Sequence, residues 1–196
     1  MVVAQDVAPP GWVDAPLELT ISREVDAARY GGVSLYATAA IWSREVADVL
    51  NAMPPGCLDQ LGEEAVEDGT AEPLLAHIDL DSLTASDWTA IGEADVEAEA
   101  ARFFEVVDEP LRRWAAARQS PRRLIELQGA PGAAAAHQSE LVRTMTVLSV
   151  QQGLVDEARR LVAEYVPAVP DTEERFTRFE VELARRFPEY GSTTRS

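Results

Sequence analysis

The segment from Glu93 to Gln128 constrains the fold most, because its hydrophobic residues recur at the spacing of an α-helix. They fall three or four residues apart along the chain, at Val96, Ala100, Phe103, Val107, Leu111 and Trp114. This spacing places them on one stripe of a helix, which can be buried against other elements. Acidic residues gather at its start and arginines toward its end, the order that the helix dipole favours. The segment therefore predicts a helix between a sheet-forming part of the chain and a helical part.

Pro110 lies in the middle of this predicted helix. Proline has no backbone N–H and crowds the preceding turn, so we expect a kink or a break at this point. Asp108 and Glu109 stand four residues before Arg112 and Arg113, a spacing that favours ion pairs across the proline. We therefore predict a kinked continuation rather than two separate helices.

The residues before this helix predict a small antiparallel sheet of about four strands. Hydrophobic and polar residues alternate from Leu17 to Val25, as they do in a strand with one buried face. The segment Val33–Trp42 fits the period of a strand or of a helix. The glycine turn before it favours a strand, followed by a helix from Ser43 to Met53. Further strands are predicted at residues 74–80 and from Trp88 to Ile91.

Two segments of this part are predicted to lack regular structure. The Pro9-Pro10-Gly11 turn marks the first dozen residues as an arm, with Trp12 as its anchor. Residues 54–72 combine glycines and acidic residues with few hydrophobic ones. We therefore expect a long surface loop there.

The residues after the central helix predict further helices. Ser120, Pro121 and Gly129 have the types and positions of an N-cap, a first-turn proline and a C-terminal glycine, so they bound a short helix. After the linker Gly129–Gly132, three helices are predicted, at residues 133–152, at residues 154–165 and from Asp171 onward. The predicted fold class is α+β, a small antiparallel sheet with helices followed by an all-helical C-terminal part. The predicted division is an acidic sheet-containing part at residues 1–92, connecting helices at 93–128 and a helical part at 129–196.

The negative charge is concentrated in the first part of the chain. The formal net charge is −17 at pH 7, and residues 1–110 hold 23 acidic residues and four arginines, against 11 and 13 in residues 111–196. Acidic surfaces repel nucleic acid and anionic membranes and attract basic proteins. We therefore expect a basic protein partner, with solubility alone as the alternative explanation of the charge.

The predicted partner surface consists of acidic residues on the central helix and in the long loop. On the helix they occupy the face away from the hydrophobic stripe, and Arg102 is the only cation among residues 93–111. The residues of this surface are Glu93, Glu97, Glu105 and Glu109 on the helix and Glu63, Glu64, Glu67 and Asp68 in the loop.

One strand carries a possible metal site. His77, Asp79 and Asp81 occupy every second position, so their side chains project from one face of the predicted strand. Imidazole and carboxylate groups are ligands of divalent metals, but further ligands from other elements would be needed. A small metal-assisted hydrolase using these residues is the enzymatic alternative. The other interpretation is a solvent-exposed strand face.

The remaining candidate residues are one cysteine, one histidine and a group of arginines. Cys57 is the only cysteine and has no histidine near it in sequence, so we expect a partly buried thiol. His137 has no evident acidic partner. Five arginines form a basic cluster that could hold a phosphate or carboxylate or pair with the protein's own acids: Arg112, Arg113, Arg118, Arg122 and Arg123. No phosphate-binding glycine loop or serine elbow occurs, and no cofactor is expected.

The sequence also predicts the cellular location of the protein. No apolar run reaches the roughly 18 residues of a membrane helix, and the first residues lack the pattern of a secretion signal. A cytoplasmic location is therefore expected.

The order of predicted elements resembles uncharacterised bacterial proteins of actinobacterial type. It consists of a strand hairpin, the strand at Trp88, the helix that starts near Asp95 and is interrupted by Pro110 before Leu111 and Trp114, and a terminal helical hairpin. Some small acidic proteins of this build are immunity proteins that neutralise a secreted toxin. The resemblance thus implies a non-enzymatic protein-binding module of immunity or antitoxin type. A helical adaptor protein that uses the C-terminal hairpin is a further alternative.

Overall fold

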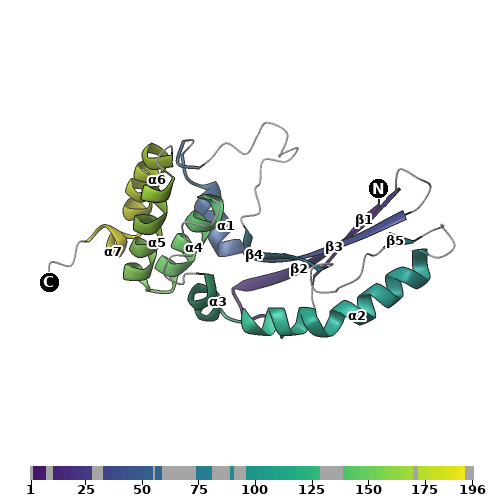
Figure 1. Ribbon diagram of the computed structural model, residues 1–196. Helices are drawn as coiled ribbons and strands as arrows, with labels where there is room; N and C mark the ends of the chain where they lie inside the picture. Colours follow the sequence, from purple (N-terminus) through teal and green to yellow (C-terminus); the bar gives the residue numbers. More distant parts are fainter. Residues whose placement is uncertain are drawn as a thin grey trace. The chain divides into compact units, whose positions relative to one another are not determined.

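The computed structural model has the predicted α+β class and divides into two compact units. It describes residues 2–7, 11–27, 33–54, 56–58, 74–80, 89–90, 96–128, 139–169 and 172–192. The first unit, here called the sheet unit, comprises residues 1–41 and 76–120. The second, the helical unit, comprises residues 42–75 and 121–196. Each unit is described by itself below (Figure 1).

The sheet contains five strands, β1 (Val2–Val7), β2 (Leu17–Ala27), β3 (Val33–Ser43), β4 (Leu74–Asp79) and β5 (Thr89–Ala90). Their order is β1-β2-β3-β4, and β5 pairs with β3. The β1–β2 pair is antiparallel, with Val2 opposite Val25 and Val7 opposite Thr20. The β3–β5 pair is also antiparallel. The predicted strands are confirmed.

Strand β1 corrects the prediction that the first dozen residues form an arm. Residues 2–7 pair along β2, whose edge would otherwise present a row of unpaired backbone N–H and C=O groups. The side chains of this segment, Val-Val-Ala-Gln-Asp-Val, do not alternate between hydrophobic and polar, so the sequence did not indicate a strand. The strand forms because its backbone groups pair with those of β2. Trp12, the predicted anchor of that arm, is partly buried and lines a pocket together with Arg112, Ala115 and Ala116.

The burial of β2 and β3 confirms most of the predicted inward positions. Leu17, Leu19 and Ile21 are buried in β2. Thr20 between them is buried too, so β2 is covered on both faces here, in contrast to the predicted strand with one buried face. In β3 the alternating buried positions are Ala37, Ala39 and Ile41. The choice of a strand for this segment is therefore correct.

Helix α2 (Val96–Ala117) is a single helix through Pro110, and it runs beside the strands (Figure 1). Its buried stripe consists of Phe103, Val107, Leu111 and Trp114, as predicted. The two predicted ion pairs across the proline form. Arg112 Nε lies 2.8 Å from Asp108 Oδ2, and Arg113 Nε lies 3.5 Å from Glu109 Oε1. The predicted continuation of the helix past Pro110 is confirmed.

The helical unit is built around one buried helix. Its helices are α1 (Arg44–Asn51), α3 (Pro121–Gln128), α4 (Ser139–Gln151), α5 (Val155–Ala168), α6 (Glu173–Arg186) and α7 (Pro188–Gly191). Helix α4 contacts α1, α3 and α5, and every residue from 142 to 150 is buried. The predicted first turns of this helix, at residues 133–138, lie outside the described residues, as does most of the predicted loop at 54–72.

Helix α4 buries polar side chains as well as hydrophobic ones. The hydroxyl groups of Thr144, Thr146 and Ser149 donate to the carbonyl oxygens four residues earlier, at 2.7 to 2.8 Å. These bonds satisfy the hydroxyl groups without another helix, which lowers the cost of burying them. Buried Arg143 places its guanidinium carbon 4.4 Å from the centre of the Phe176 ring.

The turn between α4 and α5 lies at Gly153, where the sequence separates two predicted helices. Gly153 has φ +73 between α4 and α5, a conformation that favours glycine. The predicted first residue of α6, Asp171, lies outside the described residues. Thr172 is the residue before α6, and its hydroxyl donates to the carbonyl of Val169, at 2.7 Å. Among the described residues, none of the helices combines the length and the apolar character needed to cross a membrane.

Candidate functional site

The loop before β2 brings an aromatic side chain to the end of α2. The backbone N–H of Asp14 donates to the carbonyl of Gln119 at 2.7 Å, and the side-chain amide of Gln119 donates to Asp14 Oδ1 at 3.5 Å. The loop itself is closed by a bond from the N–H of Leu17 to the carbonyl of Asp14. These contacts hold Trp12 against the last turns of α2.

Trp12 and Arg112 form a stacked pair. The guanidinium carbon of Arg112 lies 4.7 Å from the centre of the indole ring, within the range of a cation–π contact. Arg112 is held in place from the other side by its 2.8 Å hydrogen bond to Asp108. That bond raises the pKa of Arg112 above its ordinary value, with a smaller opposing effect of desolvation. The guanidinium group is therefore charged and fixed in orientation.

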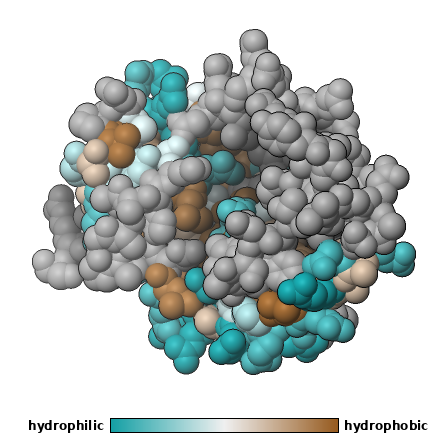
Figure 2. Space-filling view, turned by 45° about the vertical axis from the view of Figure 1, so that its right-hand side comes forward, coloured by the Kyte–Doolittle hydropathy of each residue, from teal (hydrophilic) through white to brown (hydrophobic). Residues whose placement is uncertain are grey.

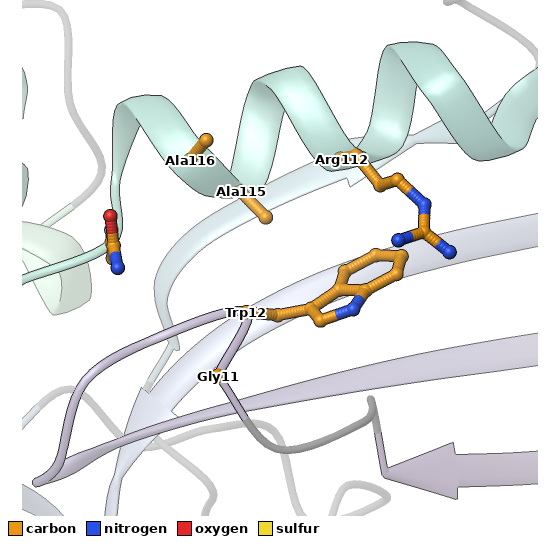
Figure 3. A pocket seen from close by; sticks show the side chains of 6 residues that line it. Gly11, Trp12, Arg112, Ala115 and Ala116 are labelled. Atoms are coloured by element: carbon orange, nitrogen blue, oxygen red, sulfur yellow. The ribbon is translucent and has the colours of Figure 1, made fainter.

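A shallow pocket of about 180 Å³ opens beside this pair (Figure 3). It is lined by Gly11, Trp12, Arg112, Ala115, Ala116 and Gln119. The small residues create the space, while the ring, the guanidinium and the amide provide a flat apolar surface and hydrogen-bond donors. None of these six side chains is a nucleophile or titrates near neutral pH. The pocket therefore suits recognition of a protruding side chain.

The exposed face of α2 continues from this pocket toward its N-terminal end. Glu105, Glu109, Arg112 and Ala116 follow each other at steps of four, three and four residues, so they lie on one stripe, and all four are exposed. Figure 2 shows hydrophilic side chains along the lower edge of the view, where α2 runs in Figure 1, with single hydrophobic groups among them. We call Glu105, Glu109, Arg112 and Ala116 the outer stripe of α2.

The structure places only some of the predicted partner-binding acids. Glu97 and Glu105 are exposed, as predicted, and neither forms an ion pair within the described part of the chain. Glu109 is exposed but pairs with Arg113, and Arg102 pairs with Glu99 at 3.4 Å. Ion pairs within α2 therefore neutralise more of its acidic side chains than the sequence predicted. The remaining members of the predicted surface lie outside the described residues: Glu93, Glu63, Glu64, Glu67 and Asp68.

Two of the three predicted metal ligands lie close together. Nε2 of His77 is 3.5 Å from Oδ1 of Asp79, and the two side chains are 47% and 63% exposed. Asp81 lies outside the described residues. Within the ranges that the structure describes, no three His, Cys, Asp or Glu side chains are placed to hold a metal ion. The metal site therefore stays a prediction.

The arginine cluster is divided among local contacts. As described above, Arg112 and Arg113 pair with acids on α2, and on α3 Arg122 and Arg123 both approach Glu126, at 3.7 and 3.2 Å. Arg118 donates to the carbonyl of Trp114 at 3.2 Å and lies over its ring. Four of the five arginines therefore pair with nearby acids, but only Arg112 and Arg113 pair with the acidic first part of the chain, as predicted.

Cys57 is 4% exposed, so the predicted small buried thiol is confirmed. Burial, and secondarily the charge of Glu182, raises the pKa of the thiol above its ordinary value. A raised pKa lowers the fraction of reactive thiolate at neutral pH. His137 lies outside the described residues.

Comparisons of the chain with protein-family models, curated proteins and solved structures found no match.

The Trp12 pocket was not predicted from the sequence, because its two sides are about a hundred residues apart in the chain. The signals that could have indicated it are the Pro-Pro-Gly-Trp turn and the run of alanines at 115–117.

Proposed function

We propose that the protein is a non-enzymatic protein-binding module that meets a basic partner through its sheet unit. The binding surface consists of the Trp12 pocket, the outer stripe of α2 and the neighbouring Glu97. The stacked Trp12–Arg112 pair at the edge of an open pocket carries this proposal. Tryptophan and arginine dominate the binding energy of protein interfaces, most of all where a rigid side chain borders a pocket.

The charge of the sheet unit supports a basic partner. This unit holds 15 acidic residues and six arginines, a net charge of −9. The carboxylates of Glu97 and Glu105, which form no ion pair with other described residues, lie on the same helix as the pocket. Such a field speeds the encounter with a cationic protein, and the effect weakens as salt rises. An immunity-type role, in which the chain covers a basic toxin, is the form that the sequence resemblance implies.

The test of the pocket uses two alanines that are neighbours in the sequence. Ala116 lines the pocket, whereas Ala117 is exposed but does not line it. A partner is captured from cell extract with the whole chain, identified and purified, and its binding is measured by surface plasmon resonance. We expect Ala116→Arg to weaken binding by on the order of 10-fold or more, as loss of an interface anchor does. Ala117→Arg adds the same charge and should have a much smaller effect.

The test of the acidic face uses charge reversal. The double change Glu97→Arg and Glu105→Arg should slow association several-fold at low salt and leave the dissociation rate nearly unchanged. Asp48→Arg, at an exposed position of α1 in the other unit, is the control. The proposal would be refuted if the Ala116→Arg variant and the double variant both bound the partner as the wild type does.

A further inference from the structure

A second concave surface lies in the helical unit, between α5 and α6. It is a groove of about 480 Å³ whose walls are two helical stripes. On α5 the wall contains Val162, Ala163, Val166 and Pro167, and on α6 it contains Glu173, Thr177 and Glu180, with Phe176 at the base. Val162 and Phe176 are buried, so the floor of the groove is apolar.

The rim of the groove has an excess of negative charge. Glu173 is exposed, and its carboxylate has no ion-pair partner within the described residues. Glu180 accepts one hydrogen bond, from the hydroxyl of Tyr190 at 2.8 Å. Among the described residues, Arg159 is the only cation that lines the groove. It is already engaged, because its Nη2 donates to the carbonyls of Tyr190 and Ser192 at 2.7 Å and its Nη1 lies 3.6 Å from Asp156.

Pro167 adds a backbone acceptor to the same wall. In a regular helix the N–H of residue 167 would donate to the carbonyl of Ala163, but proline has no N–H. Ala163 and Pro167 both line the groove. The carbonyl oxygen of Ala163 therefore lacks the donor that a regular helix would give it.

We propose that this groove binds a short segment of a partner protein in which a lysine or arginine stands next to a large apolar side chain. The apolar side chain packs on the accessible Ala163, Val166 and Pro167, above the buried Val162 and Phe176. The cation meets the carboxylates of Glu173 and Glu180, neither of which forms an ion pair with another described residue. Donors of the segment can also reach the carbonyl of Ala163.

The size of the groove decides what kind of segment fits. Glu173 and Glu180 are seven residues apart on α6, a distance of about 10 Å along the helix axis. That length matches about three residues of extended chain at roughly 3.3 Å each. A short extended segment therefore fits better than a whole helix.

The probe for this proposal is the blocked tripeptide acetyl-Leu-Arg-Leu-amide, titrated into the isotope-labelled full chain and followed by NMR. We expect amide shifts concentrated on α5 and α6. Acetyl-Leu-Glu-Leu-amide and acetyl-Ser-Arg-Ser-amide should each bind at least several-fold more weakly, because the first lacks the cation and the second the apolar anchor.

Two adjacent glutamates on α6 provide the matched variants. Glu173 lines the groove, whereas Glu174 does not and pairs with Arg178. Glu173→Arg should weaken binding of the Leu-Arg-Leu peptide several-fold, and Glu174→Arg should leave it nearly unchanged. The variant Ala116→Arg should also bind the peptide normally, so failure of the sheet-unit proposal and failure of this one are distinguishable.

Three results would overturn the proposal. The first is equal binding of the three peptides, and the second is equal binding by the Glu173→Arg and Glu174→Arg variants. The third is a set of shifts on α5 and α6 that grows with protein concentration in the absence of peptide. That result would assign the groove to a second copy of the chain.

Discussion

Tyr190 and Arg159 join α7 to the rest of the helical unit. The buried Tyr190 hydroxyl donates to Glu180 Oε1 on α6, while Arg159 on α5 donates to the carbonyl of Tyr190 itself. Its guanidinium carbon also lies 5.8 Å from the centre of the Tyr190 ring. A four-residue helix cannot be stable alone, so these side-chain contacts hold it in place. The sequence pattern predicts no separate helix at these residues.

The pH dependence of stability should report on Tyr190. Burial, and then the neighbouring Glu180, raises the pKa of its hydroxyl above the ordinary value of about 10. The unfolded chain therefore loses this proton first as pH rises. The contribution of Tyr190 is fully present below about pH 10 and is lost at higher pH. Denaturant unfolding of the wild type should thus show stability falling above pH 10.

The variant Tyr190→Phe provides the comparison. It loses the bond to Glu180, so its free energy of unfolding at pH 7 should be about 1–2 kcal/mol lower. It should also fall less steeply above pH 10 than that of the wild type. Parallel pH profiles of the two proteins would contradict the role given to this hydroxyl.

At the scale of an element, α2 shows which features the spacing of residues along one helix can predict. Its stripe positions, its continuation past Pro110 and both ion pairs across the proline follow from residues three or four positions apart. The contact of Arg112 with Trp12 does not, because a loop far away in the sequence supplies the ring. Local spacing thus determined which face of α2 is buried, and tertiary structure determined what its exposed face contacts.

Truncating the buried stripe of α2 should destabilise the protein strongly. Phe103 is 1% exposed and Trp114 is 9% exposed. Phe103→Ala or Trp114→Ala should each lower the free energy of unfolding by about 3–5 kcal/mol, through lost burial and the cavity left behind. Val106→Ala, at a position that is 46% exposed on the same helix, should change it by only about 0.5 kcal/mol. Denaturation midpoints that do not separate these variants would show that the stripe is not core.

At the scale of the whole molecule, the charge asymmetry along the chain does not match the two units. The helical unit holds 19 acidic residues and 11 arginines, a net charge of −8, close to the −9 of the sheet unit. The reason is that residues 42–75, which carry eight acids and one arginine, belong to the helical unit. Both units therefore repel anions and attract cations.

Salt should stabilise this protein. Like charges repel one another in the folded state, and dissolved ions screen exposed charges beyond about 10 Å at 0.1 M. Raising sodium chloride from about 0.01 to 0.1 M should raise the melting temperature by roughly 2–4 °C, which corresponds to about 1 kcal/mol for a chain of this size. Sucrose, which stabilises proteins without screening, is the control. A melting temperature that falls with salt would show that the internal ion pairs outweigh the repulsion.

The sequence alone determined the features that depend on neighbours in the chain. The α+β class, the strands β2 and β4 and the buried face of α2 follow from periods of two and of three to four residues, and β3 follows from the glycine turn before it. Tertiary structure alone decided the features that join distant segments. Strand β1 takes its partner from β2, the Trp12 pocket needs both a loop and a helix, and the α5–α6 groove exists only between two packed helices. A side-chain period encodes which face of an element is apolar, but not which other element covers it.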